Sequence, residues 1–243
     1  MNNATVVLER LLRSLPPSEH VPLVLGRDES LVPLSLIDDP AWVAEQIRLR
    51  GERWNTNDRR VLVTLWWYSA SSWTIGPTLT SLVMGSDLLS AEVSDLDLHW
   101  LPDSRVTGAT SRRVLHGDDR LALAGESLRS LYSYVLPILA EYGHMRERPL
   151  WAIAADAIAN RLLWLGRALS SELENVKRVT SLLDPLTEQI GGPLPLTRYT
   201  RTDDFEAMHT HRCSCCLLFL TPQGGKCASC PRGGDLRVTA QCS

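Results

Sequence analysis

Four cysteines near the C-terminus limit how the end of this chain can fold. Cys215 and Cys216 are adjacent, and ten residues separate them from the turn Cys227-x-x-Cys230. Thiolates gathered in this way are typical metal ligands, and a Cys-x-x-Cys turn offers two sulfurs to one metal ion. We therefore expect residues 215–230 to fold around a metal centre.

The adjacent pair of cysteines requires a particular backbone. Successive side chains point to opposite faces of a strand and diverge on a helix, so Cys215 and Cys216 converge only where the backbone turns sharply. This arrangement is awkward for one tetrahedral zinc ion, which normally lies between two Cys-x-x-Cys turns. It favours a 2Fe-2S cluster bound by Cys215, Cys216, Cys227 and Cys230, with a structural zinc site or a group of disulfides as the alternatives.

The spacing Cys-Cys-x10-Cys-x2-Cys resembles the C-terminal motif of the FhuF-like ferric-siderophore reductases. The flanking residues Arg212, Leu217 and Pro231 agree with that resemblance. It covers only the C-terminal segment, since residues 1–203 hold no motif that matches position by position. The resemblance implies an oxidoreductase of iron acquisition, which uses a 2Fe-2S cluster to reduce an Fe(III)-siderophore and release Fe(II).

Electron supply follows from what the sequence lacks. A 2Fe-2S cluster carries one electron at a time, and the chain has no Gly-x-Gly-x-x-Gly after a strand, so no nicotinamide or flavin site is indicated. We therefore expect an external electron donor, a ferredoxin or a flavoprotein reductase. Two other functions remain as alternatives: a non-catalytic binding module stabilised by zinc, and an iron-sulfur redox sensor.

Several neighbouring residues have two interpretations. Cys213 lies two residues before the pair and is either a spare thiol or a replacement ligand for Cys215, and Cys242 lies outside the pattern. His209 and His211 precede the cysteines, whereas the histidines of Rieske centres follow theirs in two separate loops. We expect these two histidines to face solvent or to lie beside the site.

Local charge and burial would tune such a cluster in opposite directions. Arg212, Lys226 and Arg232 would raise its reduction potential, whereas the apolar run 217–220 would lower it by restricting solvent access. Gly224-Gly225 is expected to permit the turn that returns Cys227 to the pair.

Composition excludes some partners and indicates a compartment. The 243 residues carry a net charge of -3, are 44% hydrophobic and contain no basic stripe, so we expect no nucleic-acid partner. The N-terminal residues 1–17 predict a short amphipathic helix whose charges interrupt the apolar stretch that a secretory signal needs. We expect a cytoplasmic protein, with peripheral association with a membrane left open, and a reducing compartment disfavours structural disulfides.

Residues 61–86 contain no charge and are long enough to span a bilayer. Their many hydroxyl side chains and the central Gly76-Pro77 favour two buried segments that meet there instead. Trp66, Trp67 and Trp73 are expected in the core, with contact to a large ligand as the alternative.

The rest of the body predicts helices and one hairpin. Asp39 caps a helix over about 40–51, strands within 94–115 flank the turn at Pro102-Asp103, and Asp118-Asp119 open a long helix that bends at Pro137. Arg112-Arg113 lie on the solvated face of the hairpin or anchor an acidic iron chelate. Another helix starts at Pro149, with Leu169 and Leu173 prolonging it before Pro185.

These patterns predict a mainly α protein with a small β-hairpin, an α+β arrangement. We divide it into a helix-rich, siderophore-binding body over residues 1–203 and a short iron-sulfur segment over residues 204–243. The run Gly191-Gly192-Pro193-Leu194-Pro195 breaks the helical pattern between them.

Overall fold

The computed structural model describes residues 3–85, 87–200, 208–226 and 230–231. This part of the chain is mainly helical with short strands in small sheets, as predicted. The helices are α1 (Asn3–Ser14), α2 (Pro40–Trp54), α3 (Arg59–Thr74), α4 (Gly76–Met84), α5 (Arg120–Tyr142), α6 (Arg148–Leu169), α7 (Leu173–Thr180) and α8 (Leu183–Ile190). The strands are β1 (Ser30–Pro33), β2 (Leu88–Leu89), β3 (Leu96–Trp100), β4 (Val106–Ser111), β5 (Val114–Leu115), β6 (Arg198–Tyr199) and β7 (Thr210–His211).

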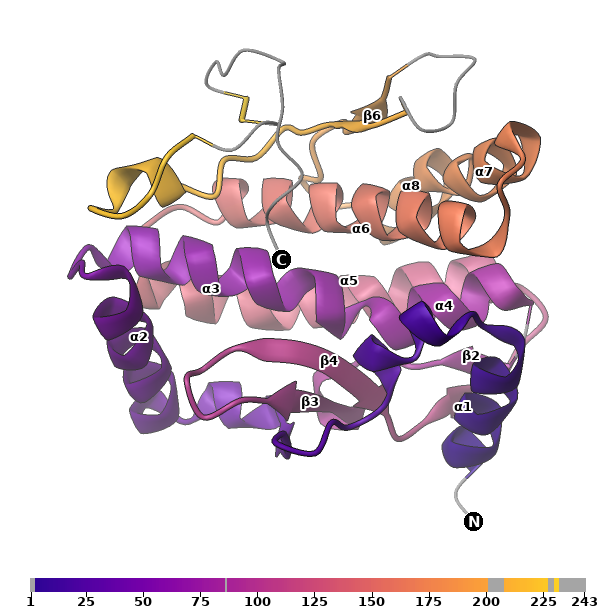
Figure 1. The fold of residues 1–243 in the computed structure, drawn as a ribbon, viewed down its shortest axis with the longest axis horizontal. Helices are drawn as coiled ribbons and strands as arrows, with labels where there is room; N and C mark the ends of the chain where they lie inside the picture. The colour runs from indigo at the N-terminus through magenta and orange to yellow at the C-terminus, as the bar shows by residue number, and fades with distance from the viewer. Residues whose placement is uncertain (1–2, 86, 201–207, 227–229, 232–243) are drawn as a thin grey trace.

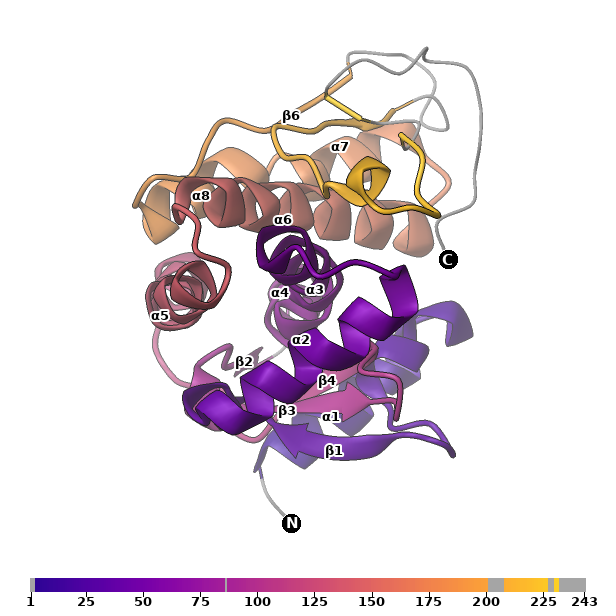
Figure 2. The ribbon, with the colours of Figure 1, turned by 90° about the vertical axis from the view of Figure 1, so that its left-hand side faces the viewer.

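The elements stack in layers, as Figure 1 and Figure 2 show. Helices α3, α4 and α5 lie in the middle, with the sheet of β1, β3 and β4 on one side and α6, α7 and α8 on the other. Strands β6 and β7 lie on the outer side of α6. The described part of the predicted metal-binding segment, which follows β7, therefore lies on the surface of the helical body.

Helix α2 begins where its sequence predicts and ends later than predicted. The Asp39 carboxylate accepts a hydrogen bond from the backbone N–H of Ala41 at 2.9 Å, and Pro40 occupies the first helical turn. The helix continues past Gly51 to Trp54, because the left-handed residue that ends it is Asn55, with φ 47°. Asparagine tolerates this conformation better than other residues with a side chain.

The uncharged stretch forms two buried helices, α3 and α4, which meet at Gly76 as expected. No helix in the described ranges is both long and apolar enough to cross a bilayer. Trp66 and Trp67 point to different parts of the core: Trp66 packs edge-on against Trp42, and Trp67 packs edge-on against Tyr132. Core packing, and not a ligand surface, explains these two side chains.

The predicted hairpin is present as β3 and β4, with residues 101–105 forming its turn. The sequence did not reveal that β1 pairs with the other edge of β3, so that Ser30 lies opposite Trp100. The resulting order is β1-β3-β4, and β2 pairs with β5 in a separate two-stranded ladder.

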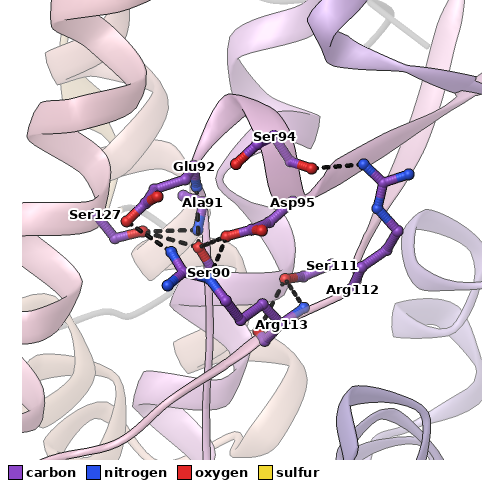
Figure 3. A network of polar contacts seen from close by, with 9 residues as sticks. All are labelled: Ser90, Ala91, Glu92, Ser94, Asp95, Ser111, Arg112, Arg113 and Ser127. Atoms are coloured by element: carbon purple, nitrogen blue, oxygen red, sulfur yellow. Dashed lines mark hydrogen bonds and ion pairs between the residues drawn. The ribbon is translucent and has the colours of Figure 1, made fainter. Parts of the chain in front are cut away.

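A polar network ties this hairpin to helix α5 (Figure 3). The Asp95 carboxylate accepts hydrogen bonds from the Ser90 hydroxyl at 2.7 Å and from Arg113 Nε at 2.6 Å. Ser127 on α5 accepts a hydrogen bond from the backbone N–H of Ala91 at 2.8 Å. Arg112 pairs with Asp97 at 3.1 Å. Both arginines are thus engaged by carboxylates of their own hairpin region, which favours the structural interpretation of Arg112-Arg113 over the chelate anchor.

Helices α5 and α6 dominate the second half of the body. Asp119 caps α5 by accepting a hydrogen bond from Ala122 N at 3.0 Å, and the helix continues through Pro137. The expected extension of α6 to Leu173 is wrong. Ser170 is extended, and its hydroxyl accepts a hydrogen bond from Glu172 N at 3.0 Å, so the chain leaves α6 and begins α7.

Candidate metal centre

Helix α6 carries one carboxylate within an alanine-rich run, and this carboxylate holds the segment that leads to the cysteines. Asp156 is 1% exposed and lies on the same helical face as Ala152 and Ala159. These small side chains leave the helix carbonyls accessible, so that Tyr199 donates a hydrogen bond to Ala159 O at 2.8 Å. A second chain segment can therefore pack directly against α6.

Asp156 accepts hydrogen bonds from two chain segments, at residue 197 and at residues 213–214. Its Oδ1 binds the Cys213 N–H at 3.0 Å and the Thr197 hydroxyl at 2.9 Å, and its Oδ2 binds the Ser214 N–H at 2.9 Å and the Ser214 hydroxyl. A buried charge is tolerated only when it is paired and hydrogen-bonded in this way. Asp156 therefore fixes residues 213–214, directly before the predicted ligands.

Arg212 supplies the opposite charge. Its Nε lies 3.6 Å from Asp156 Oδ2, and its guanidinium lies 4.7 Å from the ring centroid of Tyr68 on α3. Both ionic side chains are almost fully buried. Because the charge of Arg212 is offset by Asp156, this arginine raises the potential of a nearby cluster less than its sequence position suggests.

The Cys213 sulfur points toward α6. Although the residue as a whole is exposed, Sγ lies 3.2 Å from both Asp156 Oδ1 and the Thr197 hydroxyl, and 3.6 Å from Ala152 O. Burial of this sulfur raises the pKa of Cys213 to about 11. The described geometry thus favours Cys213 as a thiol that anchors the segment, and not as a substitute for Cys215.

Cys215 and Cys216 follow this anchor and meet helix α3. Cys216 is 7% exposed and shares a hydrophobic cluster with Val61 and Leu65 of α3. The backbone turns one residue after the pair, where Leu217 is left-handed with φ 61°, and the turn expected at Cys215-Cys216 itself stays a prediction. Such a conformation is uncommon for a residue with a side chain.

A short 3-10 helix, η5 (Leu218–Leu220), continues the loop and closes onto Gly224. Thr221 N and the Thr221 hydroxyl both donate to Leu218 O, and Gly224 N donates to Thr221 O at 3.1 Å. A Cβ atom on Gly224 would lie 1.9 Å from Leu218 O, whereas one on Gly225 would meet nothing within 4 Å. Of the predicted glycine pair, Gly224 is the one that the turn requires.

The structure places three of the four predicted ligands. Cys215 is partly buried, Cys216 and Cys230 are buried, and Cys227 lies outside the described residues, as does Cys242. Among the described residues, no three His, Cys, Asp or Glu side chains come together as a metal-binding group. The donor set itself fits the predicted cofactor, because soft thiolates in apolar surroundings are the usual ligands of iron-sulfur clusters.

The apolar residues that cover Cys216 are only partly those predicted from the sequence. Leu217 and Leu218 pack against the cluster of Val61, Leu65 and Cys216 as expected, whereas Leu220 is exposed. Trp54 and Tyr68 complete this cover, and neither was singled out from the sequence. His209 and His211 both face solvent, with their ring centroids 5.2 Å apart.

Two clefts lie near this region. The larger, about 640 Å³, is lined by the C-terminal half of α2, residues 55–57, the start of α3 and Tyr142. The smaller, about 290 Å³, lies between α8 and residues 192–197 and carries the carboxylates of Asp184 and Glu188. Volumes of several hundred Å³ are typical of small-molecule sites.

Asp156 is the functional residue that sequence reasoning missed. A single charged residue inside the run WAIAADAIA was the available signal, because charged groups are rarely buried without a partner. Its partners lie more than 40 positions away along the chain, so the pairing itself was not visible.

Comparison with known proteins supports the 2Fe-2S site predicted from the cysteine spacing. Residues 212–232 match the family model described as the FhuF 2Fe-2S C-terminal domain. No curated protein matches the chain. The matched range includes all four predicted ligands and begins at Arg212, the partner of Asp156. The chain therefore has a C-terminal 2Fe-2S domain of the FhuF type, which supports an FhuF-like family for the protein.

Proposed function

We propose that the protein is a ferric-siderophore reductase that transfers one electron to Fe(III) held by a siderophore and so releases Fe(II). The match of residues 212–232 to the FhuF 2Fe-2S C-terminal domain carries this proposal. Oxygen-rich chelators hold ferric iron much better than ferrous iron, so reduction alone weakens the complex. The electron comes from a separate donor, a ferredoxin or a flavoprotein reductase.

The cluster ligands in this proposal are Cys215, Cys216, Cys227 and Cys230. A 2Fe-2S cluster supplies single electrons and needs no acid or base from the protein for the transfer. The chain's own residues bind and shield it. Asp156 holds the backbone before Cys215, and Val61 and Leu65 exclude water from the side of Cys216.

The larger cleft is the best-placed site for the chelate. The first turns of α3 contribute to both places: Val61 and Leu65 pack with Cys216, while Arg59 and Leu62 line the cleft. The two places therefore lie on neighbouring faces of the same two turns of α3. The smaller cleft is less suitable as a site for the chelate, because two carboxylates line it. Thr197 also lines it, and the hydroxyl of this residue is already engaged by Asp156.

The test is anaerobic stopped-flow oxidation of the reduced protein by ferric hydroxamate, catecholate and mixed chelates, with an Fe(II) trap. We expect oxidation that saturates with one chelate class and releases one Fe(II) per electron. A protein that carries the cluster but reduces none of these chelates would be better explained as a redox sensor. A colourless protein that contains one zinc ion per chain would favour the binding module.

A further inference from the structure

The indole of Trp54 contains a buried hydrogen-bond donor that has no acceptor. Trp54 is the last residue of α2, and its ring packs against the hydrophobic cluster of Val61, Leu65 and Cys216. Its Nε1 atom is buried and has no hydrogen-bond partner. By contrast, Trp67 Nε1 donates to Leu150 O at 3.0 Å. A buried indole N–H usually finds such a partner, so the exception needs an explanation.

The ring of Trp54 is also held in place. The guanidinium of Arg53 lies 5.7 Å from the ring centroid, and Arg53 Nη1 is itself fixed by Asp103 Oδ2 at 3.0 Å. Turning the indole to give its N–H to water would break this cation–π contact as well as the packing on Val61 and Leu65. The donor therefore stays buried, on a ring that packs against the hydrophobic cluster containing Cys216.

We propose that Trp54 Nε1–H donates a hydrogen bond to a sulfur of the bound 2Fe-2S cluster, or to its Cys216 ligand, and thereby raises the reduction potential. Sulfurs of a four-thiolate cluster carry negative charge, and reduction increases it. A donor aimed at them stabilises the reduced state more than the oxidised state. The inference rests on the cluster and on Cys216 as a ligand, and it is independent of the electron acceptor.

Trp66 provides the matched control. Its Nε1 is also buried without a partner, but the ring lies in the main core, edge-on to Trp42 at 6.4 Å, and is 2% exposed. A buried indole N–H without a partner therefore occurs twice in the described residues, and only that of Trp54 packs with a predicted ligand. Replacing each tryptophan by phenylalanine removes one N–H and leaves an aromatic ring.

The first experiment is an anaerobic redox titration of the holoprotein and the variants Trp54→Phe and Trp66→Phe, with iron and sulfide content measured in parallel. We expect full cluster content in both variants. Trp54→Phe should have a more negative potential, by up to about the 59 mV that corresponds to a tenfold change in the reduced-to-oxidised ratio. Trp66→Phe should keep the wild-type potential. An unchanged potential in a fully loaded Trp54→Phe would overturn the inference.

The decisive measurement of a second experiment is made on the wild-type protein. Pulsed EPR of the reduced wild-type protein, with isotope-labelled indole nitrogens, should detect one nitrogen coupled to the cluster. The coupling should persist in Trp66→Phe and disappear in Trp54→Phe. Its absence from the wild type would refute the hydrogen bond even if Trp54→Phe failed to bind the cluster. Neither experiment uses a siderophore, so a protein that passes both and reduces no chelate would contradict only the proposed function.

Discussion

The carboxylate of Asp156 accepts a hydrogen bond from the backbone N–H of Ser214 at 2.9 Å, one residue before Cys215. This contact joins the rigid middle of α6 to the start of the cysteine motif. The precision with which the thiols are placed thus depends on a residue outside the segment that matches the FhuF domain.

Replacing Asp156 by alanine should detach the cysteine segment. The change leaves Arg212 without its carboxylate and removes the acceptor of two backbone N–H groups, and breaking a buried ion pair costs roughly 3–5 kcal/mol. We expect loss of bound iron and sulfide and a lower urea midpoint. Glu174→Ala is the control, since its side chain is 84% exposed and its pair with Lys177 is worth little. Normal cluster content in Asp156→Ala would show that residues 213–214 are positioned by other contacts.

The two adjacent glycines should respond differently to alanine. Gly224→Ala places a methyl group against Leu218 O and the Thr221 hydroxyl, and overpacking of this kind costs at least about 1–3 kcal/mol. Gly225→Ala meets open space. Absorbance and iron analysis after anaerobic reconstitution should show reduced cluster content only in Gly224→Ala. Equal loss in both variants would mean that backbone freedom, and not space, limits the turn.

Serine substitutions should separate ligands from anchors. Cys215, Cys216, Cys227 and Cys230 are the predicted ligands, so each change to serine should abolish or strongly reduce the visible absorbance and EPR signal of the cluster. Cys213→Ser should keep both, because a serine hydroxyl can donate to Asp156 in place of the thiol. Retained cluster in Cys215→Ser together with loss in Cys213→Ser would reverse the assignment of these two residues.

Arg59 should contribute to chelate binding if the larger cleft is the substrate site. It lines the cleft and donates to His144 Nε2 at 3.2 Å. Arg59→Gln should raise the half-saturating concentration of the preferred ferric chelate several-fold, which corresponds to about 1 kcal/mol. The cluster potential should not change. Arg178→Gln, on α7 outside the cleft, is the control, and equal kinetics for all three proteins would place the chelate elsewhere.

Stability should depend on pH through His99. Its ring is fully buried in β3, and burial lowers its pKa in spite of the attraction of Glu29 and Asp97. In the unfolded chain a histidine has a pKa of about 6.5. As pH falls below that value, the unfolded state takes up a proton that the folded state does not, so the free energy of unfolding decreases.

Urea unfolding between about pH 5 and pH 7.5 measures this effect, whose slope is at most about 1.4 kcal/mol per pH unit for one group. His99→Gln should unfold with a smaller pH dependence than the wild type. The exposed His116 gives the control His116→Gln, which should keep the wild-type dependence. An unchanged slope in His99→Gln would assign the acid sensitivity to other groups.

Local signals in the sequence predicted the beginnings of helices well. Asp39 and Asp119 cap their helices as expected, because an N-cap depends on neighbouring residues alone. Helix ends were less accurate, since Asn55 and not Gly51 takes the left-handed conformation that ends α2. Strand β1 was missed because its partner β3 lies some 70 positions later, beyond the reach of a local pattern.

In the candidate site too, local features were predictable from the sequence and tertiary contacts were not. The cysteine spacing predicted the 2Fe-2S domain, whereas the left-handed backbone of Leu217, one residue after the adjacent pair, was not predicted. The division between a body at residues 1–203 and a segment at 204–243 stays a prediction, as do the ligands and the electron donor. The roles of Asp156 and Trp54 depend on tertiary contacts, those of Asp156 with residues 197 and 213–214 and those of Trp54 with α3, which no spacing rule describes.

Helix α3 serves two interiors at once. Val61 and Leu65 touch the cysteine segment, while their neighbours Leu62 and Trp66 belong to the main core. Substitutions on either face of this stretch should therefore be harmful. Those at Val61 and Leu65 should bleach the protein, and those at Leu62 and Trp66 should make it insoluble.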